Sequence, residues 1–314
     1  MPYRKSLAPA LFLVLAVPLA AAGPSGFDSN RAYDHLRTVV GFGPRPPGSP
    51  ALDATRKYIR EQLGAVGVKV VDQTWDASTP VAWAERPQVR MTNLVATIPG
   101  TRPERIIFGG HYDTKLFRDF RFVGANDGGS SAAFLIELAR VLKARKNPFT
   151  MEILFLDGEE AFHPTAWAGT DHTYGSRYYV EAAQKAGTLK SIKAFVLVDM
   201  IGARNLILDR ESNSTPWLMD AVWQSAKKLG YQDHLGQPSA IEDDHMPFLA
   251  AGVQAVDLID LNNYSPWHTP EDTLDKVSAG SLQIVGDILL NALPGIEARL
   301  GKPGATYAPA KSKR

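Results

Sequence analysis

Four short apolar runs in this sequence each lead into histidine or acidic residues, or into a loop that contains them. The runs are RIIFGG (105–110), MEILFL (151–156), AFVLV (194–198) and a segment that ends near residue 259. Amphipathic helical patterns separate the strands along the chain. Continuous apolar strands that alternate with such helices predict an α/β domain. Its sheet should be open, doubly wound and mostly parallel but mixed, with helices on both faces.

Periodicity and turn residues place the individual elements. Ser49 followed by Pro50 is typical of a helix start, and a Pro-Gly turn at 99–100 joins two strands of a meander that opens the sheet. Pro294 should end or kink the last helix. The expected helices are 28–39, 49–63, 130–144, 215–229 and 278–293, and the expected strands lie in 68–75, 91–110, 151–156, 194–198 and 253–259.

The first 22 residues have the layout of a secretory signal peptide. Arg4 and Lys5 precede an apolar segment over 7–19, and small residues follow up to Ala22. The segment is short for a membrane span and is interrupted by proline, so we expect cleavage after about Ala22. An uncleaved membrane anchor is the alternative. The mature protein is expected to be exported, to the periplasm or the medium, without stable membrane association.

Composition limits the kinds of partner and of site. The chain has 314 residues, 45% of them hydrophobic, which suffices for one large core. We expect a single catalytic domain over 23–300 and a disordered basic tail over 301–314. The 34 basic and 33 acidic residues nearly cancel, which argues against nucleic acid as a partner. The absence of cysteine excludes disulfides and thiolate metal sites, so a metal would need His, Asp and Glu.

The residues that follow the apolar runs predict one site. Ligands of open α/β sheets bind outside the carboxyl ends of the strands, so these side chains should converge on one crevice. A further acid, Asp127, lies in the glycine-rich turn GANDGGSS before a helix, where a helix N-cap is the alternative role. Histidine and carboxylates without cysteine match a catalytic zinc site. The strand-end residues are His111, Asp113, Asp157, Glu159, Glu160, Asp199, Trp267 and His268.

Two adjacent glutamates, Glu159 and Glu160, follow MEILFL after only Asp157 and Gly158. Carboxylates this close together repel each other and are costly to bury without a cation or a shared proton. One of the pair could bind a metal while the other stays free as a general acid or base. A solvated acidic turn or helix start is the alternative, but the buried strand just upstream favours a functional pair.

The other histidines carry weaker signals. His35, His163, His172 and His234 are expected to be surface or structural residues. His245 lies in IEDDHMPFL, which is either an acidic helix start or a second functional loop.

The motifs together identify a family. HYDTK, FVGANDGGSSAAFLIELAR, LFLDGEEAF, YGSRYY, VDMIGA, IEDDHMPFL and WHTPED occur in the order found in the glutaminyl-peptide cyclotransferases, zinc enzymes also called glutaminyl cyclases. The resemblance runs from about residue 28 to about 295. These enzymes are similar in fold to the di-zinc aminopeptidases, so a zinc exopeptidase-like fold is implied. The insertion AFHPTAWAGTDHT before YGSR resembles a cyclase loop.

The resemblance implies a reaction and a role for each site residue. The substrates would be peptides or proteins with N-terminal glutamine, converted to pyroglutamate with release of ammonia by a monomer that carries one zinc ion. An exported di-zinc aminopeptidase is the alternative, and a catalytically silent binding domain is a third reading. The implied zinc ligands are Asp127, Glu160 and His268, and the implied acid/base is Glu159, with Asp199 and Asp243 forming a hydrogen-bonded acidic network beside it. The implied pocket residues are Trp267, Trp167 and Glu242. His111 would be a second-metal ligand, in a peptidase only.

Two positions depart from the family pattern. Asp257 stands where the family commonly has a histidine, which should change the charge and the proton network near the site. The aromatic residue that usually precedes the Trp-His pair has no clear match, and Tyr264 is the candidate for its place.

Overall fold

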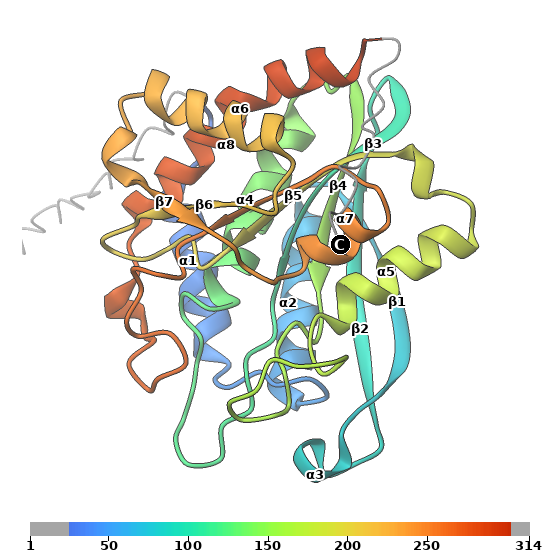
Figure 1. The fold of residues 1–314 in the computed structure, drawn as a ribbon, viewed down its shortest axis with the longest axis vertical. Helices are drawn as coiled ribbons and strands as arrows, with labels where there is room; N and C mark the ends of the chain where they lie inside the picture. The colour runs from blue at the N-terminus through green and yellow to red at the C-terminus, as the bar shows by residue number, and fades with distance from the viewer. Residues whose placement is uncertain (1–24, 303–314) are drawn as a thin grey trace, which may run out of the picture.

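The computed structural model describes residues 25–302 (Figure 1). The predicted signal peptide and nearly all of the predicted basic tail lie outside the described residues. Six strands form one mixed sheet in the order β1-β2-β4-β3-β5-β8. The antiparallel pairs are β1/β2 and β2/β4, and the remaining neighbours are parallel, as predicted. The strands are β1 (Lys69–Ser78), β2 (Gln88–Ile98), β3 (Arg102–His111), β4 (Phe149–Leu156), β5 (Ile192–Asp199) and β8 (Ala255–Ile259).

Helices cover both faces of this sheet, which confirms the predicted layers. Side chains alternate along each strand, so Ile106 and Phe108 of β3 join one core cluster and Ile107 joins another on the opposite face. The first cluster packs against α1 (Ser29–Gly41), α2 (Pro50–Ala65), α4 (Gly129–Ala144), α6 (Pro216–Lys228) and α8 (Ala279–Leu300). The second packs against α5 (Tyr174–Lys185) and α7 (His245–Ala250).

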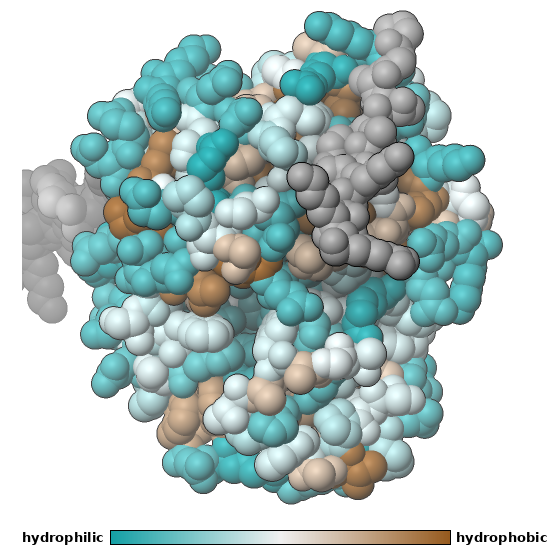
Figure 2. All heavy atoms as spheres, in the orientation of Figure 1, coloured by the Kyte–Doolittle hydropathy of each residue, from teal (hydrophilic) through white to brown (hydrophobic). Residues whose placement is uncertain are grey.

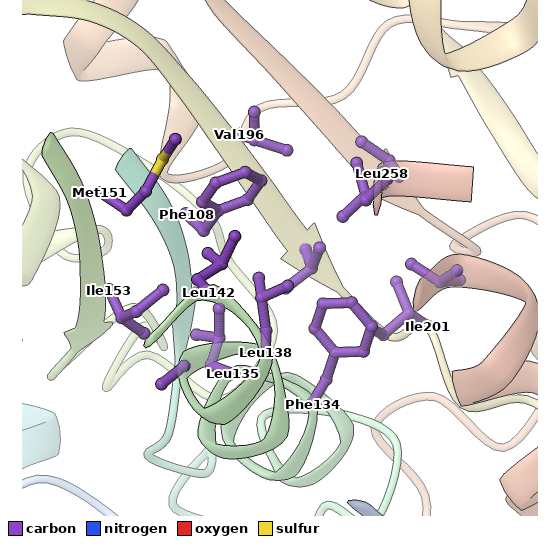
Figure 3. Packing of buried hydrophobic residues seen from close by; sticks show 14 of the residues in the cluster. Phe108, Phe134, Leu135, Leu138, Leu142, Met151, Ile153, Val196, Ile201 and Leu258 are labelled. Atoms are coloured by element: carbon purple, nitrogen blue, oxygen red, sulfur yellow. The ribbon is translucent and has the colours of Figure 1, made fainter. Parts of the chain in front are cut away.

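Helix α4 occupies the centre of the larger cluster. Leu135, Leu138 and Leu142 recur at helical spacing and point toward the sheet, where they meet residues of β3, β4 and β5 (Figure 3). Nearly every residue of the helix is buried, which suits a helix enclosed by the sheet and by α1, α2 and α8. The helix therefore fixes the turn at its N-terminus, which carries Asp127.

The smaller elements include several that the sequence did not predict. A short helix, α3 (Val81–Ala84), lies at the tip of the long β1–β2 hairpin, which extends beyond the rest of the sheet (Figure 1). A second sheet pairs β6 (Leu208–Glu211) with β7 (Leu235–Ser239). Three 3₁₀ turns complete the described chain, at Leu189–Ser191, Gln232–His234 and Leu274–Lys276.

Two predictions about helix ends had different outcomes. Ser49 caps α2 by accepting a hydrogen bond from Leu52 N, with Pro50 in the first turn, as predicted. The last helix does not end before Pro294, because α8 continues to Leu300. Its last turns bury Ile296 and Leu300 in the core, and this packing outweighs the lost backbone hydrogen bond.

The same helix is the one described segment that is long and apolar enough to cross a membrane. In its most apolar window, 56% of the residues are buried inside the fold, which is typical of a core helix. On the face shown in Figure 2, outside the grey atoms, hydrophobic residues are scattered among hydrophilic ones and form no continuous patch.

Candidate active site and metal centre

The carboxyl ends of the parallel strands open onto a cavity of about 280 Å³, called the strand-end cavity below. Parallel strands deliver the residues that follow them to the same edge of the sheet. Every residue predicted to be catalytic, to bind substrate or to hold the single metal ion lines this cavity. They are Asp127, Glu159, Glu160, Trp167, Asp199, Glu242, Asp243, Trp267 and His268.

Three of these residues form a metal donor set. Nε2 of His268 lies 3.1 Å from Oε1 of Glu160 and 3.3 Å from Oδ2 of Asp127. One donor atom from each residue lies within 4.8 Å of the others. Oδ2 of Asp127 and Oε2 of Glu160 are buried without a hydrogen-bond partner in the described chain. Buried carboxylate oxygens without partners are costly, and nitrogen and oxygen donors at this spacing suit zinc, so the residues fit the metal that the family implies.

A second donor set shares Asp127. Nε2 of His111 lies 3.1 Å from Oδ1 of Asp127 and 3.1 Å from Oδ1 of Asp199. Burial alone would lower the pKa of His111, but the carboxylates of Asp199 and Glu159 outweigh it and raise that pKa well above its usual value. Each oxygen of Asp127 thus faces a different histidine. This geometry is what a two-metal site would require.

Glu159 is held by its main chain. Its carboxylate makes no hydrogen bond within the described residues, and its Oε2 lies 3.8 Å from Nδ1 of His111. Oδ1 of Asp113 accepts a hydrogen bond from Glu159 N at 3.2 Å, and Oδ2 of Asp113 accepts one from Glu160 N at 3.4 Å. Gly158 precedes the pair with a φ of +70°, and an added Cβ would lie 2.6 Å from Sδ of Met91. The glycine in DGEE is therefore required by a tight turn against β2.

Burial makes Glu159 suited to proton transfer. The residue is 6% exposed, and burial, with further contributions from nearby carboxylates, raises its pKa well above the usual range for glutamate. A buried carboxylate with a raised pKa is a stronger base than a solvated one, which suits a group that accepts a proton and then returns it.

Asp157 does not join the site, contrary to the prediction that all the strand-end acids converge. Oδ2 of Asp157 accepts hydrogen bonds from Arg56 at 2.9 Å and from Thr92 N at 2.7 Å. These contacts tie β4 to α2 and to β2, on the side away from the cavity. Burial raises the pKa of Asp157 to about 7. The three acids of FLDGEEAF therefore have separate roles, one of them purely structural.

The acidic residues beside Glu159 are close but not directly bonded. Burial and the neighbouring Asp199 raise the pKa of Asp243 to about 7. Oδ1 of Asp199 accepts from Met200 N at 2.8 Å, and Oδ1 of Asp243 accepts from Asp244 N at 2.5 Å. Within the described residues, no direct hydrogen bond links Glu159, Asp199 and Asp243. The predicted hydrogen-bonded network therefore has no direct bond among these three side chains in this structure, and they interact through their charges.

Asp257 faces a buried histidine instead of the cavity. Its Oδ2 lies 3.7 Å from Nδ1 of His245, whose Nε2 lies 3.2 Å from Oε2 of Glu211. His245 is fully buried and begins α7, directly after three acidic residues, so the segment is an acidic helix start, and Glu242 and Asp243 of the preceding loop line the strand-end cavity. Tyr264 is also buried, and its hydroxyl donates to Asp272 at 2.6 Å, so its side chain does not line the strand-end cavity.

The tryptophans border the cavity in different ways. Trp267 is 42% exposed and stacks on His268, with ring centroids 4.2 Å apart. Trp167 stacks on His172 at 4.4 Å. Glu242 is exposed at the rim. His172 is thus a structural histidine, and so is His35, which is buried and hydrogen-bonded to Tyr58.

Sequence reasoning missed Lys115, the basic residue of the strand-end cavity. Its ammonium group donates to the carbonyl oxygen of Ala161 at 2.8 Å and lies 3.8 Å from Oε2 of Glu160. The lysine is only 3% exposed. Its place in HYDTK, four residues after His111, was the available signal, because any residue so close to a strand end is brought near the site.

Comparison with known proteins agrees with this geometry. Residues 93–293 match the model of peptidase family M28. The glutaminyl-peptide cyclotransferase of Bos taurus is 30% identical over 283 residues, which span 78% of this chain and 76% of the bovine protein. The chain belongs to the glutaminyl-peptide cyclotransferases of peptidase family M28.

Solved structures of both a glutaminyl cyclase and an aminopeptidase have folds similar to that of this cyclotransferase. The crystal structure of an Acidobacteriales bacterium glutaminyl cyclase is similar with a TM-score of 0.81 and 38% identity, over 91% of this chain and 100% of that one. A leucine aminopeptidase precursor from Bacteroides thetaiotaomicron has a TM-score of 0.77 and 26% identity, over 85% of this chain and 96% of that one.

Proposed function

We propose that this enzyme converts the N-terminal glutamine of peptides and proteins to pyroglutamate and releases ammonia. The observation that carries the proposal is a buried free acid, Glu159, beside a metal donor set in a small cavity whose wall includes Trp167 and the residues before it. The membership in the cyclotransferase family supports the same reaction.

The proposed reaction takes place within one substrate residue. The α-amino nitrogen attacks the side-chain amide carbon, a new carbon–nitrogen bond closes the five-membered ring, and the bond to the amide nitrogen breaks. Zinc held by Asp127, Glu160 and His268 would supply Lewis acidity toward the side-chain carbonyl oxygen. Glu159 takes a proton from the attacking amine and returns it to the departing nitrogen, which leaves as ammonia.

The walls of the cavity hold the reacting conformer. Ile241, Ile259 and Trp267 surround the space beside the donor set and limit the volume available to water. Because nucleophile and electrophile belong to the same residue, confinement in a curled conformation lowers the entropic cost of ring closure. Asp199 and Asp243 line the cavity beside Glu159, and the carboxylate of Asp243 adds to the raised pKa of Glu159.

The second candidate function is a two-metal aminopeptidase, favoured by the His111, Asp127 and Asp199 donor set. Metal content and product distinguish the two. The cyclotransferase should bind one zinc per chain, lose ammonia release after chelation and regain it with added zinc. Two tightly bound zinc ions per chain, together with release of amino acids from peptides, would favour the aminopeptidase instead.

We also propose that the protein is exported as a monomer after cleavage near Ala22. The layout of the first 22 residues supports export. Sequencing the N-terminus of the exported protein tests cleavage, and light scattering of the purified domain tests its mass. A retained N-terminus or a stable dimer would contradict these two proposals.

A further inference from the structure

Asp272 lies four residues after His268 and outside the strand-end cavity. It is 1% exposed, and its carboxylate accepts three hydrogen bonds. Asn126 N donates to Oδ1 at 2.8 Å, and Asp127 N donates to Oδ2 at 3.1 Å. The hydroxyl of Tyr264 donates to Oδ1 at 2.6 Å. One carboxylate thus joins the turn that carries Asp127 to the loop that carries His268.

The side chain of Asn126 extends the same connection to a third loop. Its amide nitrogen donates to the carbonyl oxygen of Met200 at 3.1 Å, and its amide oxygen accepts from Gly202 N at 2.7 Å. The loop after β5, which follows Asp199, is therefore fixed to the Asp127 turn. Three loops that carry donor residues meet at Asn126 and Asp272, and neither of these two residues lines the cavity.

The backbone of the turn around Asp127 needs stabilising contacts to hold its conformation. Gly124 and Gly128 flank it with φ angles of +48° and +74°, and His268 itself has a φ of +56°, which is unfavourable for a residue with a Cβ. Backbone of this kind holds its geometry only where surrounding contacts determine it. The hydrogen bonds to Asp272 are contacts of that sort, because they bind two consecutive backbone N–H groups of the turn.

We propose that Asp272 is a positioning residue that sets the metal affinity of the site without touching the metal. It orients Asp127 relative to His268, whose Nε2 lies 3.3 Å from Oδ2 of Asp127. The inference rests on the proposed metal site and deepens it. Residues that orient metal ligands typically change metal affinity tenfold to a hundredfold when they are replaced.

The test is Asp272→Asn, which keeps the size of the side chain. An amide has a single acceptor oxygen, so one of the two backbone N–H groups of the turn would face a donor. We expect the zinc affinity of the folded variant, measured by competition with a fluorescent chelator, to fall by about tenfold or more. The turnover number kcat should fall more than KM rises, because the donor set and not the pocket wall is disturbed.

Asp287→Asn is the matched control. Asp287 is buried in α8, away from the cavity, and its carboxylate likewise accepts three hydrogen bonds, from Ser25, Tyr231 and Gln283. Both variants should lower the melting temperature, but Asp287→Asn should bind zinc as the wild type does. Equal zinc affinities for Asp272→Asn, Asp287→Asn and the wild type would overturn the proposal.

Tyr264→Phe is the milder test, should Asp272→Asn fail to fold. It removes one of the three donors, so we expect a smaller loss of zinc affinity in the same direction. An unchanged affinity in a folded Tyr264→Phe protein would count against the positioning role. Failure of the proposed function is a separate outcome: a wild type that binds zinc but releases no ammonia from glutamine peptides contradicts the reaction and leaves the affinity comparison intact.

Discussion

Replacing Glu159 by glutamine separates the acid/base role from metal binding. The change keeps the size of the side chain and removes its charge and its capacity to accept a proton. The main chain here is held by other groups: Glu159 N donates to Asp113, and Glu159 O accepts from Thr173 N at 2.8 Å. The adjacent ligand Glu160 should therefore stay in place, and the variant should retain zinc.

The expected loss is large and confined to turnover. A positioned general acid or base contributes about 10² to 10⁴ in rate, which is about 2.7 to 5.4 kcal/mol of transition-state stabilisation. Stability should not fall, because burial already disfavours the charged form of Glu159 and the nearby Glu160 and Asp243 add to its raised pKa. A neutral glutamine avoids the cost of a buried charge.

Three measurements check this prediction on one protein sample: kcat of ammonia release at saturating peptide, zinc content, and melting temperature. We expect kcat to fall at least about a hundredfold at full zinc occupancy. Glu160→Gln is the contrasting variant and should lose zinc. Turnover of Glu159→Gln within about tenfold of the wild type would refute the assignment of Glu159 as the acid/base.

Three further predictions concern other parts of the molecule. His268→Ala should lose tightly bound zinc, measured by elemental analysis after dialysis, and full occupancy would remove His268 from the ligand set. Leu138→Ala, in the fully buried face of α4, should lower the free energy of unfolding by about 2 to 5 kcal/mol in denaturant titrations; a loss below about 1 kcal/mol would contradict the described packing. Burial lowers the pKa of His35 in the folded protein. Below pH 6.5, His35 is therefore more protonated in the unfolded chain than in the folded protein, and stability is lost as the pH falls from 6.5 toward the lowered pKa. His35→Gln should remove part of that loss between pH 7 and 5 in melting curves, and an unchanged pH dependence would contradict this.

The strand positions follow from features that a sequence displays. The four apolar runs became β3, β4, β5 and the edge strand β8, and their residues are almost all buried, because short apolar runs favour strands that are covered on both faces. The small sheet of β6 and β7 was missed because its strands are short and β7 contains Pro238, which is unfavourable in a strand. Of the two effects expected of Pro294, an end of the helix is excluded, because tertiary packing continues α8 to Leu300.

The donor set was predictable because its members lie at strand ends or in a glycine-rich turn. Asp157 was wrongly grouped with them, since its carboxylate accepts hydrogen bonds from Arg56 and Thr92 N and does not line the cavity. Asp272 and Tyr264 carried no signal of their roles. The backbone partners of Asp272 lie 146 and 145 residues earlier in the chain, and such long-range hydrogen bonds depend on how the loops dock after the sheet has formed.

The most direct test of the proposed function is mass spectrometry of a peptide that begins with glutamine, incubated with the purified mature protein and zinc. Loss of one ammonia from an otherwise intact peptide, absent in Glu159→Gln, is the predicted result. Release of free glutamine and a shortened peptide would contradict the proposal. It would mean that Glu159 activates water and that His111 belongs to a two-metal site.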